Sequence, residues 1–128
     1  MSESRAPDDP LKTLEQRLRD FADERDWDQF HSPKNLAMAL IGEAGELVEH
    51  FQWLTEAESA GLSPEKLAEV KLEMADILIY LIRLADKLEV DLVAAADEKI
   101  LLNERKYPAD RVRGDARKYT EYRGAGDD

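Results

Sequence analysis

The fold of this chain is decided by the run Glu73-Met74-Ala75-Asp76-Ile77-Leu78-Ile79-Tyr80-Leu81-Ile82. On a helical wheel, apolar side chains cover most of the circumference around residues 77–82. A surface helix of a small monomer needs only one apolar stripe. We therefore expect a helix that is covered on nearly all sides, in part by a second copy of the chain.

Three further helices flank this run. Apolar residues recur at spacings of three and four from Leu11 onward, which predicts a first helix. The pairs Ser32-Pro33 and Ser63-Pro64 each supply an N-cap and a first-turn proline. Asp91 can cap a last helix, which Pro108 closes. The predicted helices cover residues 11–25, 33–53, 64–87 and 92–106, with a linker at 54–63.

No stretch alternates polar and apolar residues as a strand does. We expect an all-α fold, a four-helix bundle-like protomer that assembles as an oligomer with helices packed across subunits. Residues 1–10 are predicted to be a flexible leader, 11–107 a helical domain and 108–128 a polar C-terminal tail.

The composition excludes several classes of protein. The 128 residues contain 29 acidic and 18 basic side chains, so the net charge is −11. Such a surface repels nucleic acid and anionic membranes, and no run approaches the roughly 20 apolar residues of a membrane span. The absence of cysteine excludes disulfides and thiolate zinc sites, and two histidines are too few for a three-histidine metal site. We expect a cytoplasmic protein.

Two pairs of carboxylates carry the chemistry. Glu43 and Glu46 lie three residues apart, as do Glu73 and Asp76, so each pair emerges on one face of a helix. Glu43 falls inside an apolar stripe, where an unpaired charge is costly, and few basic residues share these faces. A divalent cation resolves this, and ligands that are all oxygen favour Mg²⁺, with Mn²⁺ as the alternative.

Glycines at 42 and 45 cost helix stability, about 1 kcal/mol each relative to alanine. We expect a close neighbour to need the space that they leave. A plainer interpretation of the acidic residues stays open, because glutamate and aspartate on helices usually form a solvated surface.

Other side chains suit a nucleotide. Lys99, Asn103 and Lys106 share one helical face beside Tyr107, and a lysine with an amide suits phosphate oxygens, although a solvated face also has this pattern. Aromatic side chains and one histidine suit a pocket for base stacking, although each could also belong to the core. These candidates are Trp27, Phe30, His31, Trp53 and Tyr80.

The chain resembles the all-α nucleoside triphosphate pyrophosphohydrolases, the MazG-like enzymes, and most closely their dCTP pyrophosphatase branch. The resemblance covers about residues 11–108. It rests on several ordered blocks, which are Glu-Arg-Asp-Trp-Asp-Gln-Phe-His (24–31), Pro-Lys-Asn-Leu (33–36), Gly-Glu-Ala-Gly-Glu-Leu-Val-Glu (42–49), Phe-Gln-Trp (51–53), Glu-Met-Ala-Asp-Ile-Leu-Ile-Tyr (73–80) and Lys99 to Pro108.

The resemblance implies a Mg²⁺-dependent enzyme that hydrolyses nucleoside triphosphates to the monophosphate and pyrophosphate, which would make residues 11–107 a MazG-like catalytic domain. It implies metal ligands at Glu43, Glu46, Glu73 and Asp76, with Glu43 or Glu46 activating the attacking water. It also implies phosphate contacts from Lys99, Asn103 and Tyr107, and base or sugar contacts from Trp27, His31, Trp53 and Tyr80. Animal dCTP enzymes carry a histidine at the position of Leu18, so the preferred base stays open.

Two other interpretations compete with this hypothesis. The chain could be a non-enzymatic, oligomeric helical interaction module with a solvated acidic face. A di-iron bundle is disfavoured, because that design uses Glu-x-x-His on two helices, and neither His31 nor His50 follows a glutamate by three.

Overall fold

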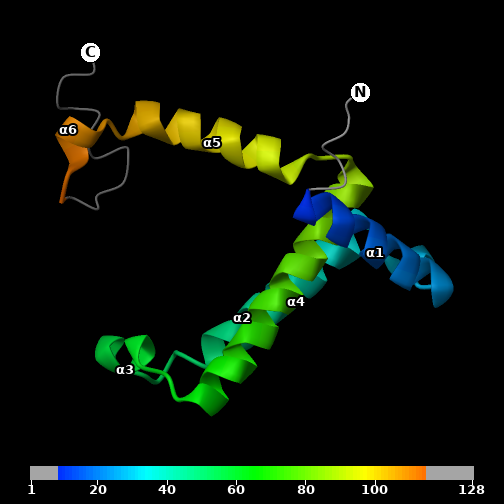
Figure 1. The fold of residues 1–128 in the computed structure, drawn as a ribbon, viewed down its shortest axis with the longest axis horizontal. Helices are drawn as coiled ribbons and strands as arrows, with labels where there is room; N and C mark the ends of the chain where they lie inside the picture. The colour runs from blue at the N-terminus through cyan, green and yellow to red at the C-terminus, as the bar shows by residue number, and fades with distance from the viewer. Residues whose placement is uncertain (1–8, 115–128) are drawn as a thin grey trace. The chain divides into compact units, whose positions relative to one another are not determined.

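The computed structural model describes residues 9–114 and is helical throughout that range, with no strand in it (Figure 1). The chain divides into two compact units, one up to Val90 and one from Asp91. The predicted all-α class is therefore confirmed, whereas the four-helix packing and the oligomer stay predictions. No helix in the described range is long and apolar enough to cross a bilayer.

Local capping sets the starts of the first two long helices. Helix α1 (Pro10–Glu24) begins after Asp9, whose carboxylate accepts a hydrogen bond from the backbone N–H of Leu11 at 3.0 Å. Helix α2 (Pro33–Glu49) begins after Ser32, whose hydroxyl accepts from the N–H of Asn35 at 3.1 Å. Both helices place proline in the first turn, where its missing N–H costs nothing. A short 3-10 helix, η2 (Asp28–Phe30), lies between them.

The predicted end of the second helix is wrong. We expected this helix to continue to about residue 53, but α2 ends at Glu49, with His50 as its C-cap and a turn through residues 51–53. The predicted linker also contains a helix, α3 (Glu56–Ala60). A capping box starts it, in which the Thr55 hydroxyl and the Glu58 carboxylate each accept a backbone N–H of the other residue.

Helix α4 (Pro64–Leu88) is the centre of the first unit. It lies antiparallel beside α2 over much of its length, and α1 packs against it as well (Figure 1). Within residues 9–114 the buried apolar side chains are few and come from α1, α2 and α4: Ala22, Leu36, Val70, Ile82 and Ala85. The rest of the predicted apolar circumference is partly exposed, since Leu78, Ile79 and Leu81 keep 40%, 37% and 37% of their surface in solvent.

Up to residue 114, the second unit contains α5 (Leu92–Lys106) and the short α6 (Ala109–Val112). The bounds predicted for α5 are confirmed, and Asp91 caps it by accepting from the N–H of Ala94 at 3.0 Å. Helix α6 falls in the predicted polar tail, whose residues 115–128 lie outside the described range, as do residues 1–8 of the predicted leader.

Candidate active site

The packing of α2 on α4 brings three of the predicted carboxylates together. Glu43, Glu73 and Asp76 each offer one oxygen, and these oxygens all lie within 4.8 Å of one another. All three side chains are half-buried. Two helices that are separated by the α3 segment in the sequence therefore contribute to one acidic cluster, from which Glu46 is one helical turn away on α2.

The charges in this cluster oppose one another. Burial raises the pKa of Glu43, and the charges of Glu46, Asp76 and Glu73 raise it further. The charge of Glu73 raises the pKa of Glu46, with burial as a second cause. Within residues 9–114, Glu43, Glu46 and Asp76 form no ion pair with a basic side chain. A hard divalent cation, which prefers carboxylate oxygens, fits this set of donors.

His50 contacts one member of the cluster, Glu73, and sequence reasoning missed this neighbour. Its Nε2 lies 3.5 Å from an oxygen of Glu73, and its Nδ1 lies 3.3 Å from the Nζ of Lys66. The spacing could have revealed it, because His50 follows Glu43 by seven residues and so shares its helical face. His50 is therefore placed to orient the Glu73 carboxylate through its ring.

The close neighbour expected beside the two glycines does not come from the described residues of the same chain. A Cβ atom added at Gly42 or Gly45 would meet no other heavy atom within 4 Å, apart from the helix's own nearby backbone and adjacent residues. Both glycines are exposed on α2. Nothing in the described part of the chain uses the space that they leave.

A cavity of about 230 Å³ adjoins the acidic cluster, because Asp76 lines both. Three of the predicted base contacts, Trp27, His31 and Tyr80, also line it. Trp27 packs edge-on against Phe21, with ring centroids 5.6 Å apart, which fixes one wall of the cavity. Leu18, Ala22, Ile79 and Arg83 complete the lining.

Two of the predicted aromatic candidates, Trp53 and Phe30, do not line the cavity. Trp53 follows the end of α2, is 87% exposed and does not line the cavity, so the helical wheel that placed it beside Glu46 does not apply. Phe30 is 59% exposed and does not line it either. Lys99, Asn103 and Tyr107 lie on α5 or at its end, in the second unit, and their role stays a prediction.

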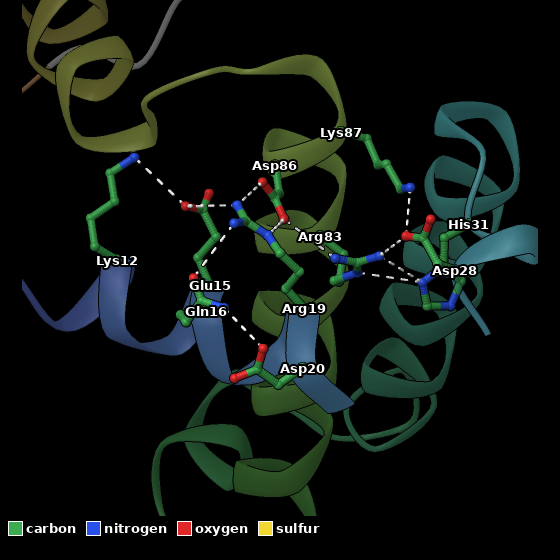
Figure 2. Close-up of polar contacts among 10 residues, drawn as sticks. All are labelled: Lys12, Glu15, Gln16, Arg19, Asp20, Asp28, His31, Arg83, Asp86 and Lys87. Carbon is green, nitrogen blue, oxygen red and sulfur yellow. Dashed lines mark hydrogen bonds and ion pairs between the residues drawn. The ribbon is translucent and has the colours of Figure 1, made fainter. Parts of the chain in front are cut away.

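A chain of ion pairs includes Arg83, which also lines the cavity (Figure 2). Arg83 of α4 donates to Asp28 at 2.9 Å and to Asp86 at 3.3 Å. Lys87 also donates to Asp28, at 2.6 Å, and Arg19 of α1 donates to Asp86 at 2.7 Å. Lys87 and Arg83 hold the pKa of Asp28 below its usual value. These contacts join α1, η2 and α4, the elements that also supply most of the cavity wall.

Comparisons with family models, with individual proteins and with solved structures all point to the same family. The model of the MazG-like family matches residues 41–122. The dCTP pyrophosphatase 1 of Homo sapiens is 47% identical over 118 residues, which make up 91% of this chain and 69% of the human protein. The rat protein of the same name is 43% identical over the same shares of each chain. A crystal structure of a pyrophosphatase from Archaeoglobus fulgidus aligns with a TM-score of 0.76 at 38% identity, and covers 84% of this chain and 98% of the archaeal one. The chain therefore belongs to the MazG-like family, in the branch of the dCTP pyrophosphatase 1 proteins.

Proposed function

We propose that this chain hydrolyses dCTP or a modified dCTP to the monophosphate and pyrophosphate, with Mg²⁺ held by its carboxylate cluster. The enzyme class, a nucleoside triphosphate pyrophosphohydrolase, is confirmed by the relatives named above. The observation that carries the finer proposal is the junction at Asp76, which lines the cavity and belongs to the acidic cluster. A nucleotide whose base enters the cavity would bring its phosphates toward those carboxylates.

The residues take the following roles in this proposal. Glu43, Glu46, Glu73 and Asp76 hold the cation, and Trp27, His31 and Tyr80 contact the base or sugar. When bound, Mg²⁺ would neutralise the carboxylates and stabilise the charge that develops on the phosphate oxygens.

Glu43 or Glu46 accepts the proton of the water that attacks the α-phosphorus, in line with the departing pyrophosphate. Lys99, Asn103 and Tyr107 of the second unit are the proposed phosphate contacts, and Trp53 is a further proposed base or sugar contact.

The proposal predicts a defined pattern of products. Purified chain incubated with each of the four common dNTPs and 5-methyl-dCTP should release pyrophosphate fastest from a cytosine nucleotide, and only when Mg²⁺ is present. Enzymatic detection of pyrophosphate measures the rate. dCDP is the matched control, because cleavage beside its α-phosphorus releases phosphate and no pyrophosphate. Absence of turnover on every nucleotide would contradict the proposal and leave the interaction module as the alternative.

We also propose that the active form is a homo-oligomer, either a dimer or a tetramer. An apolar stripe runs along α4 at spacings of seven, four, three and seven residues, with between 37% and 57% of each side chain exposed: Leu67, Met74, Leu78, Leu81 and Leu88. Such a stripe is the pattern by which helices pack across subunits.

Light scattering at low micromolar concentration tests this proposal. We expect a mass of at least twice the 14.6 kDa of one chain. Leu78→Arg, which places a charge in the stripe, should shift the population toward smaller species. A stable, active species of one chain's mass would show that no second copy is needed.

A further inference from the structure

Arg83 is a charged side chain buried in the wall of the cavity. Only 3% of its surface is exposed, and it is the only buried charged residue within residues 9–114. Its guanidinium is neutralised by Asp28 and Asp86, at 2.9 Å and 3.3 Å. Each of these carboxylates has a second cation of its own, Lys87 for Asp28 and Arg19 for Asp86. Arg19 and Lys87 already neutralise the two carboxylates, so ion pairing alone does not explain why Arg83 is buried beside them.

The contact that the ion pairs leave unexplained is the one with His31. The Nε and Nη2 atoms of Arg83 lie 3.4 Å and 3.2 Å from Nδ1 of the imidazole ring (Figure 2). A guanidinium has donors only and stays protonated in proteins. Nδ1 must therefore accept, which requires an unprotonated Nδ1 and leaves the ring proton on Nε2.

The surroundings of His31 agree with a neutral ring. Burial lowers the pKa of His31, and the charges of Arg83 and Lys87 from α4 lower it further, against the opposing effect of Asp28 from η2. Asp76 and Tyr80, also from α4, line the same cavity. Within residues 9–114, no hydrogen bond or ion pair engages Nε2 of His31.

We infer that Arg83 is a positioning residue that holds His31 in the Nε2–H tautomer at the wall of the cavity, so that the enzyme offers its substrate a fixed hydrogen-bond donor. This inference deepens the proposed function and rests on it. A base that binds well must have a hydrogen-bond acceptor facing Nε2–H of His31. This acceptor is a carbonyl oxygen or an unprotonated ring nitrogen. An exocyclic amine at that point would leave two donors facing each other, so Arg83 contributes to base selection through the ring of His31.

Nitrogen NMR of the histidine rings tests the tautomer directly in the nucleotide-free protein. The chain contains only two histidines, so His31 can be assigned with a His50→Gln variant. We expect the wild-type His31 ring to show a protonated Nε2 and an unprotonated Nδ1. A proton on Nδ1, or a doubly protonated ring at neutral pH, would overturn the inference.

The variant Arg83→Met removes the donor while keeping most of the side-chain volume. Both carboxylates keep a cation, so the unit should still fold. We expect the fixed tautomer to be lost and the KM for the preferred nucleotide to rise about tenfold, the equivalent of one misplaced hydrogen bond, with little change in kcat. Lys87→Met is the matched control, since it removes the other cation of Asp28 and forms no hydrogen bond with His31.

The outcomes separate the positioning role from a structural one. An unchanged tautomer in Arg83→Met, or an equal rise of KM in Lys87→Met, would overturn the inference. If Arg83→Met does not fold, the wild-type nitrogen spectrum still decides the tautomer. If the wild type hydrolyses no nucleotide, the proposed function fails and base selection by Arg83 fails with it, whereas the tautomer measurement stands on its own.

Discussion

Glu43→Gln and Glu73→Gln are each expected to lower pyrophosphate release from the preferred nucleotide by about 10³-fold. Each variant replaces one of the three carboxylates whose oxygens lie within 4.8 Å of one another with a neutral amide, so the cation loses a negatively charged ligand. Initial rates at saturating Mg²⁺ measure the effect. Glu65→Gln, an equal loss of charge at an exposed position on α4, should stay within about twofold of wild type.

The same Glu43→Gln variant should be more stable than wild type when the metal is chelated. Since the folded state raises the pKa of Glu43, its charged form opposes folding above that pKa, and a neutral amide removes this opposition. Thermal unfolding in EDTA should therefore show a higher Tm, and excess Mg²⁺ should narrow or reverse the difference. A large loss of stability in EDTA for both glutamine variants would indicate that the carboxylates are structural partners and not ligands.

Leu36→Ala should cause the largest loss of stability in the first unit, about 2 to 5 kcal/mol. Leu36 is 1% exposed, lies on α2 and is the largest fully buried side chain within residues 9–114, so truncation leaves a cavity in a small core. Urea unfolding at one fixed chain concentration measures the change. Met38→Ala, on the same helix at 60% exposure, is the control and should cost less than about 1 kcal/mol. Similar losses in both variants would contradict the assignment of Leu36 to the core.

Together, these variants distinguish residues that serve the fold from residues that serve the chemistry. Leu36→Ala should lower stability without changing the activity of the molecules that remain folded, because Leu36 is not among the cavity or cluster residues. The glutamine variants should lower activity without lowering stability. Arg83→Met forms a third class, with an intact fold and an unchanged kcat but weaker selection of the base.

The sequence by itself determined the features that depend on neighbours along the chain. The starts of α2, α4 and α5 follow from Ser32, Ser63 and Asp91, because an N-cap acts on N–H groups within the next three residues. The pairing of Glu43 with Glu46, and of Glu73 with Asp76, follows from helical spacing. The capping box of Thr55 and Glu58 is also a local pattern, and it would have predicted α3 within the expected linker.

Only the tertiary structure decided how these local features meet. The end of α2 at Glu49 has no glycine or proline beside it, so no local pattern marked it. The meeting of Glu43 with Glu73 and Asp76 depends on the register of α2 along α4, which side-chain packing sets. Arg83 reaches Asp28 and His31 across 55 and 52 residues of sequence. Helical periodicity identifies which residues share a face of one helix, whereas contacts between helices depend on how the packed faces interlock.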